Sequence, residues 1–135
     1  AKKPPPEALA EYGEEYFEIK QFSLAENIEY LTRTLEIFWA NNPNAKVIFT
    51  VSPVPSSATF FDENVAARSF ENKANLLLAV KAMVKNYPER TFYFPSFEIA
   101  MLSHNGNMQL DNRHVRPKVV NKIMKLFDRC FATRE

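Results

Sequence analysis

The stretch "KVIFTV", residues 46–51, indicates the fold class of this 135-residue chain. The three residues between Lys46 and Thr50 are all β-branched or aromatic. Polar and apolar residues do not alternate here, as they would in a half-exposed strand. This composition is typical of a strand buried on both faces of a parallel sheet. A second stretch of the same kind, "TFYF" at residues 91–94, predicts a second buried strand.

A helix is predicted before the first strand, over residues 24–41. Its apolar residues recur at three- and four-residue steps, which places them on one face. The capping box "SLAE" at residues 23–26 predicts where the helix begins. The Ser23 side chain can accept from a backbone N–H of the first turn, and the Glu26 side chain can accept from the Ser23 N–H. The stretch "NNPN" at residues 41–44 ends it.

A further helix is predicted after each of the two strands. Helical spacing returns from about Val65 to Tyr87, and Pro117 fits the first turn of a last helix. In that last helix Cys130 is expected to be a small buried packing residue. Helices that alternate with apolar strands favour a parallel sheet covered on both sides.

The predicted sheet is too small for the helices around it. Two short strands cannot cover the apolar faces of three helices, so we expect the C-terminal half of a doubly wound domain. Residues 1–22 carry no sustained periodicity and are predicted to be a linker or lid-like segment. Residues 23–135 are predicted to be the domain itself.

Composition excludes several classes of function. Seventeen basic and sixteen acidic residues nearly cancel, so the chain has no strong net electrostatic field. We therefore expect neither nucleic acid nor an anionic membrane as a partner. The apolar runs are too short to span a bilayer and no signal peptide is seen, which favours a soluble, cytoplasmic protein. Only Gly13 and Gly106 are glycines, which rules out a P-loop or Rossmann fingerprint. We expect no cofactor.

The stretch "LDNRHV", residues 110–115, carries the candidate catalytic pair. In acyl-transfer enzymes a histidine activates a serine while a carboxylate holds the other ring nitrogen. Asp111, three residues before His114, can turn its carboxylate onto Nδ1–H and leave Nε2 facing outward. The alternative is that Asp111 caps a helix and His114 is solvated.

Other polar residues follow the predicted strands. Open α/β sheets bind ligands beyond the carboxyl ends of their strands. Ser52 could line such a site, or its hydroxyl could only hydrogen-bond to backbone groups at the end of the strand. Ser96 and Glu98 could reach the same cleft. Glu98 could equally be a solvated loop carboxylate. Lys73 and Arg68 are expected to be charges on a solvated helix face.

A metal site could in principle form from His104, Asp111 and His114, since two histidines and a carboxylate can bind zinc or iron. His104 lies beside the turn "NGN" and has no partner at the i, i+4 spacing that preorganises ligands on a helix. We therefore expect no metal.

Several stretches together resemble one family, the GSCFA-domain family, over roughly residues 23–131. That family is similar to the SGNH (GDSL-like) hydrolases and, more distantly, to bacterial acyltransferases that modify capsular polysaccharide. The resemblance implies a three-layer α/β/α, flavodoxin-like fold with Asp111 as orienting acid and His114 as general base. It rests on "FTVSPVPSSATF" at 49–60, "ARSFENKANLLLAV" at 67–80, "FYFPSFEI" at 92–99 and "LDNRHV".

The sequence departs from that family in one respect. The Gly-Ser nucleophile segment is missing, since Gly13 precedes Glu14 and Gly106 precedes Asn107. Where SGNH enzymes hold an oxyanion-binding asparagine, this chain has S-P-V-P, so Ser52 or nearby backbone N–H groups are the candidate donors.

The resemblance thus implies a serine esterase or O-acyltransferase acting on acyl esters, with saccharide esters among the candidates. This chain would supply the Asp–His pair, and a missing N-terminal half or a partner chain would carry the nucleophile. The chain alone is expected to be inactive. The alternative is a non-catalytic binding or scaffold module that keeps the α/β shell.

Overall fold

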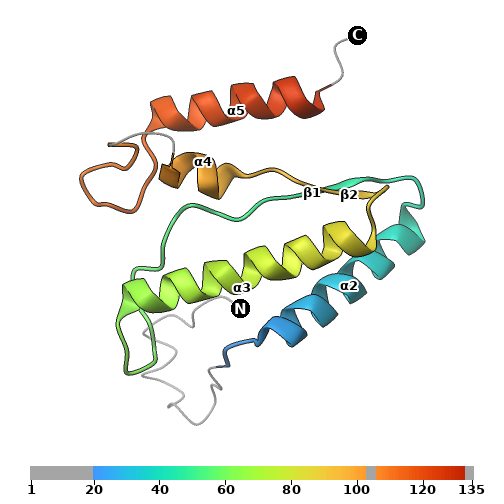
Figure 1. Cartoon of the computed structure of the whole chain (residues 1–135), viewed down its shortest axis with the longest axis horizontal. Coiled ribbons are helices and arrows are strands. Elements are labelled where there is room, and N and C mark those ends of the chain that lie inside the picture. The colour runs from blue at the N-terminus through green and yellow to red at the C-terminus, as the bar shows by residue number, and fades with distance from the viewer. Residues whose placement is uncertain (1–19, 103–105, 133–135) are drawn as a thin grey trace, which may run out of the picture.

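The computed structural model describes residues 20–102 and 106–132, and it shows a mixed α/β arrangement. The two strands run between α2 and α3 on one side and α4 and α5 on the other (Figure 1). The elements in chain order are α2 (Leu24–Asn41), β1 (Val47–Phe49), α3 (Val65–Asn86), β2 (Thr91–Tyr93), α4 (Ser96–Leu102) and α5 (Pro117–Phe131).

The two strands pair in parallel, as the sequence predicts, with Val47 opposite Thr91 and Phe49 opposite Tyr93. Each strand is shorter than predicted: β1 has three residues instead of 46–51, and β2 has three instead of 91–94. Proline follows both strands closely, at Pro53 and Pro95. Because proline has no N–H to donate to a ladder, the pairing cannot continue past these positions.

Helix α2 has the predicted bounds because the predicted capping box forms. Ser23 Oγ accepts from the Glu26 N–H at 3.2 Å, and Glu26 Oε2 accepts from the Ser23 N–H at 2.9 Å. Lys20 Nζ approaches the other carboxylate oxygen of Glu26 at 2.6 Å. At the far end the Asn42 N–H donates to the Phe38 carbonyl and closes the last turn.

The capping box should make stability depend on pH. The Lys20 ammonium and the Ser23 donors lower the pKa of Glu26 from 4.5 to about 2. A lowered pKa stabilises the folded state fully above about pH 4.5, and this contribution is lost as the pH falls towards 2. Glu26→Ala should therefore lower the thermal midpoint at pH 7, and this deficit should shrink steadily as the pH falls from about 4.5 to about 2.

Thermal unfolding followed by circular dichroism at several pH values checks this expectation. Glu29→Ala is the matched control, because Glu29 lies on the same helix outside the capping box. A deficit for Glu26→Ala that is as large in strong acid as at neutral pH would contradict the role of the carboxylate.

Helix α3 packs against α2 and fixes the start of β2. The Asn64 side chain caps it by accepting from the Ala66 and Ala67 N–H groups. Met83 is fully buried in a hydrophobic cluster with Leu35 and Trp39 of α2. The hydroxyl of the buried Thr91 donates at the end of α3, to the carbonyls of Tyr87 at 2.9 Å and Met83 at 3.1 Å. These bonds join the end of the helix to the first residue of β2.

A second hydrophobic cluster lies on the other side of the strands. Phe94, Ala100, Val115 and Ile123 form its buried centre, and partly buried residues of α5 pack around them. The rings of Phe94 and Phe127 meet edge to face with centroids 5.2 Å apart. This cluster holds α5 and the loop before it against the end of β2.

The expectation that Cys130 is buried is wrong, because its side chain is exposed. Val120 and Met124, on the apolar stripe of the same helix, are exposed as well. The apolar stripe of α5 is wider than the surface that α4 and β2 offer it, so only the line through Ile123 and Phe127 is covered.

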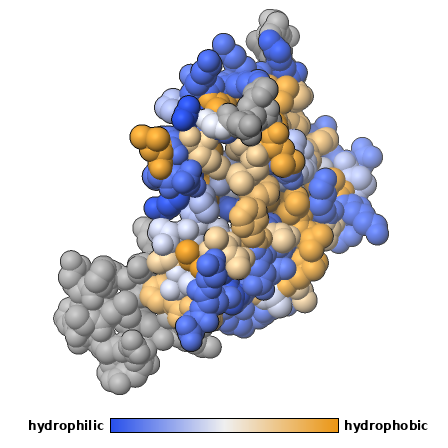
Figure 2. All heavy atoms as spheres, turned by 60° about the vertical axis from the view of Figure 1, so that its left-hand side comes forward, coloured by the Kyte–Doolittle hydropathy of each residue, from blue (hydrophilic) through white to orange (hydrophobic). Residues whose placement is uncertain are grey.

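Large apolar side chains stay on the surface elsewhere too. Figure 2 shows hydrophobic residues running through the middle of one face between hydrophilic margins. Ile37, Ile48, Phe70 and Leu78 are among the exposed residues of α2, β1 and α3. In the described part of the chain, no helix combines the length and the apolar character that crossing a membrane requires.

Candidate active site

Asp111 and His114 are in contact on the loop between α4 and α5. His114 Nδ1 lies 2.5 Å from Asp111 Oδ2. Among residues 20–102 and 106–132, no group hydrogen-bonds to Nε2 of the same ring, and the side chain is exposed. This is the geometry predicted from the D-x-x-H spacing: one ring nitrogen is held and the other is open.

The local backbone holds Asp111 in place. Its second carboxylate oxygen, Oδ1, accepts from the Arg113 and His114 N–H groups, both at 3.0 Å. Asn112 between them takes a left-handed conformation with φ of 53°, which asparagine tolerates better than most residues. The bond to the His114 side chain, and then those two N–H groups, hold the pKa of Asp111 well below its usual range.

An ionised Asp111 settles which tautomer His114 adopts. A carboxylate can only accept hydrogen bonds, so the ring proton of neutral His114 must lie on Nδ1. Nε2 then carries the lone pair. A histidine in this state can take a proton from a hydroxyl group that approaches from the open side.

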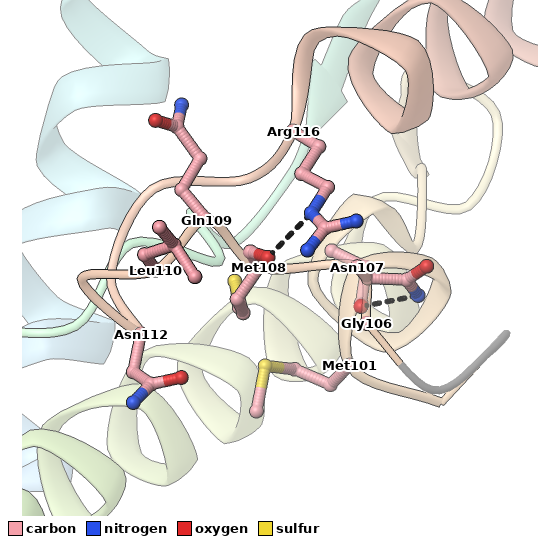
Figure 3. Close-up of a pocket in the computed structure, with 9 residues that line it drawn as sticks. Met101, Gly106, Asn107, Met108, Gln109, Leu110, Asn112 and Arg116 are labelled. Carbon is pink, nitrogen blue, oxygen red and sulfur yellow. Dashed lines mark hydrogen bonds between the residues drawn. The ribbon is translucent and has the colours of Figure 1, made fainter.

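A closed loop carries the pair. Gln109 donates to the His114 carbonyl at 2.7 Å, and Arg116 donates to the Asn107 carbonyl at 2.9 Å, on either side of a bridge between Met108 and Val115. An open hollow of about 500 Å³ borders this loop, with the Arg116 side chain bonded to the Met108 carbonyl at 2.8 Å (Figure 3). The loop is therefore fixed at its base, while Asp111 and His114 lie at its exposed end.

Lys73 was predicted to be a solvated charge, and this is wrong. Its ammonium donates to the carbonyls of Ser52 at 2.6 Å and Val54 at 2.8 Å, and the same nitrogen lies 5.7 Å from the centroid of the Phe97 ring. Burial lowers the pKa of Lys73. Lys73 thus anchors the segment after β1 to α3, a role that no local sequence signal shows.

Ser52 and Ser96 both lie at the carboxyl ends of the strands, where they were expected. The hydroxyl of Ser52 accepts from the Val54 N–H at 3.2 Å, which forms a tight turn. The hydroxyl of Ser96 contacts that of Thr50 and lies 3.1 Å from the Val51 carbonyl. Both serines therefore stabilise the segment after β1, and Ser96 joins α4 to it.

The alternative interpretation of Glu98 as a solvated loop carboxylate is wrong. Glu98 lies on α4 and is half-buried, with both its oxygens 2.8 Å from the hydroxyl of Tyr93. Burial, and then the neighbouring Glu98 carboxylate, raise the pKa of Tyr93 well above its usual range. Lys81 of α3 lies over the same tyrosine ring, at 4.9 Å from its centroid.

The structure does not join all the predicted site residues. No hydrogen bond links His114 to Ser52, Ser96 or Glu98 within the described ranges. His104, considered as a metal ligand, lies outside the described residues. Among those that are described, no three histidine, cysteine or acidic side chains gather as metal ligands.

Arg68 is also misassigned by the sequence. It forms ion pairs with Glu63 and Glu71 and covers the ring of Phe61 at 4.8 Å, so it is not a freely solvated charge.

Comparison with known proteins identifies a family. A family model described as the GSCFA family matches residues 2–127, nearly the whole chain. The match therefore also covers most of the segment predicted to be a linker or lid. Searches of curated proteins and of solved structures found no match.

Proposed function

This chain belongs to the GSCFA family, and from that premise we propose that it supplies the acid–base pair of an SGNH-like serine esterase or O-acyltransferase. Its substrates would be acyl esters, those of saccharides included. The observation that carries the proposal is the bond between Asp111 and His114 Nδ1, with Nε2 left open. Backbone contacts that preorganise Asp111 support it further.

The pair would act in two steps. In the first, Nε2 of His114 takes the proton of a serine hydroxyl as the serine oxygen attacks the ester carbonyl, and Asp111 stabilises the imidazolium. The imidazolium then gives this proton to the departing alcohol, which leaves an acyl-enzyme. In the second, Nε2 takes a proton from water or an acceptor hydroxyl, whose oxygen attacks the acyl group. The imidazolium then gives this proton to the departing serine oxygen, which restores the serine hydroxyl and the neutral histidine.

The serine of this mechanism would lie outside residues 1–135, on a longer form of the protein or on another chain. Three observations support an absent part of the domain. The outer edge of β1 is unpaired among the described residues, and Ile48 is exposed beside it. The guanidinium Nε of Arg113, between the two members of the pair, is buried without a partner there. With the missing strands added, the fold would become a three-layer α/β/α sandwich.

A serine-directed fluorophosphonate probe tests the proposal on the protein purified from its natural source, with every chain that copurifies. We expect the label on a serine of a Gly-Ser segment, and we expect His114→Ala to abolish labelling. His104→Ala is the control, because it removes the only other histidine of the chain. Labelling that persists in His114→Ala would refute the proposed role of the pair.

The non-catalytic binding or scaffold module is the second candidate. Its expected sign is an Asp111 that makes no hydrogen bond to His114, or a His114 that faces away from the cleft. The two residues are bonded. It becomes the better explanation if no serine of the natural protein reacts with the probe.

A further inference from the structure

A hollow of about 640 Å³ lies between α3, the start of α2 and the segment after β1. It is distinct from the hollow beside the Asp–His loop, because the two share no lining residue. Its wall combines side-chain amides, hydroxyl groups and aromatic rings. Among its lining residues are Gln21, Phe22, Phe60, Asn72, Lys73 and Asn75.

Two amides of α3 face this hollow. Asn72 and Asn75 are three residues apart, so they share one face of the helix. Asn72 Oδ1 accepts from Gln21 Nε2 at 3.3 Å, while the Asn72 NH₂ group and the whole amide of Asn75 have no hydrogen-bond partner among the described residues. A primary amide offers a donor and an acceptor side by side, which matches neighbouring hydroxyl groups of a sugar.

Aromatic rings form another part of the wall. Phe22 and Phe60 line the hollow and are both exposed. The Lys20 ammonium lies over the Phe22 ring, 5.8 Å from its centroid, so only the opposite face of this ring can receive a ligand. An exposed aromatic ring offers an apolar face on which the C–H face of a sugar ring can pack while the hydroxyl groups point to the amides. Apolar area with a few convergent polar groups is the usual composition of a small-molecule site.

The charges around the hollow favour an uncharged ligand. No carboxylate lines it in the described part of the chain. Its cations are already engaged: Lys20 pairs with Glu26, Arg68 pairs with Glu63, and Lys73 donates to two carbonyls. An anion would have to compete with these existing partners, whereas a neutral polyol would use the amide groups of α3 that have none within the described ranges.

Lys73 connects the hollow to the strand ends. It lines the hollow and also holds the carbonyls of Ser52 and Val54 at the carboxyl end of β1. We propose that this hollow binds the sugar ring of a neutral saccharide, and that this saccharide is the alcohol part of the ester substrate. The second half of this statement rests on the proposed function, but binding itself needs no nucleophile.

An array of neutral and uronic-acid-containing oligosaccharides tests the proposal on the 135-residue chain, displayed as a streptavidin-bound tetramer so that weak binding is amplified. We expect neutral glycans to be retained. The best of them, titrated by NMR, should shift the side-chain amide signals of Asn72 and Asn75. Asn75→Ala should weaken this binding about tenfold, because it removes both the donor and the acceptor that this amide offers.

Phe70→Ala is the matched control, because Phe70 is an exposed residue of α3 outside the lining of the hollow. It should bind like the wild type. Asn75 makes no hydrogen bond within the described residues, and alanine is the better helix former, so its replacement should not lower the thermal midpoint and a loss of binding can be assigned to the ligand.

Two results would overturn the subsite. One is that no neutral glycan is retained above the level of Asn75→Ala, and the other is that only acidic glycans are retained. These results are distinguishable from failure of the proposed function. Sugar binding without any serine labelling would refute the catalytic chemistry alone, and labelling without sugar binding would refute the subsite alone.

Discussion

Replacing Asp111 with asparagine is expected to lower kcat by about 10,000-fold in a form of the protein that carries the nucleophile. The introduced amide can keep its oxygen on the Arg113 and His114 N–H groups, which hold Oδ1 of the native carboxylate. Its NH₂ group then faces His114 Nδ1 in place of Oδ2. Nδ1 must accept from this donor, so the ring proton moves to Nε2, which can no longer take the proton of the serine.

Steady-state kinetics with an activated ester measure this loss, which should appear in kcat and leave KM nearly unchanged. Asp128→Asn is the matched control, because it makes the same replacement at an exposed position of α5. A decrease of less than about tenfold would mean that Asp111 only shapes the turn, since the tautomer effect is far larger than that.

Replacing Met83 with alanine is expected to lower the free energy of unfolding by about 3 kcal/mol. Met83 is 0% exposed and packs with Leu35 and Trp39, and its sulfur lies 3.6 Å from the hydroxyl of Thr32. The truncation leaves a cavity between α2, α3 and β1, and the rigid ring of Trp39 cannot collapse into it. The cost therefore combines lost burial with lost contacts.

Urea unfolding of both variants measures the effect. Met124→Ala removes the same atoms from a side chain that is 49% exposed on α5, and it should cost less than about 1 kcal/mol. Equal losses in the two variants would contradict the packing of α2 on α3.

The helices were predictable because their signals are local. Ser23 and Glu26 are three residues apart, and both bonds of the predicted capping box are present. The last helix begins at Pro117 as expected. Helix α4 is not among the predicted helices, because seven residues are too few to show a helical period and Pro95 precedes them.

The errors concern features that depend on distant residues. Whether Lys73 is solvated depends on where the chain goes after β1, nineteen to twenty-one residues away. The exposure of Cys130 depends on how much surface the rest of the fold offers α5. Strand lengths depend on which neighbours are present to pair. Apolar spacing alone determines none of these.

The candidate site contains both local contacts, which the sequence can predict, and contacts between distant residues, which it cannot. Asp111 and His114 meet because a separation of three residues brings their side chains together within one turn, which is one of the two interpretations that the sequence allows. The roles of Ser96 and Glu98 depend on contacts with Val51 and Tyr93, which only the folded chain reveals. Their catalytic participation stays a prediction.

His114 is attached to the hydrophobic cluster around Phe94 through its neighbour Val115. Val115, the residue after His114, is buried with Phe94 and Ile123, and the ring of Phe127 meets that of Phe94 edge to face. The cluster around Met83 lies on the other side of the strands and shares no buried residue with it. In a screen of random mutants, changes at Ile123 or Phe127 would therefore score as losses of activity, as mutations of the histidine itself would.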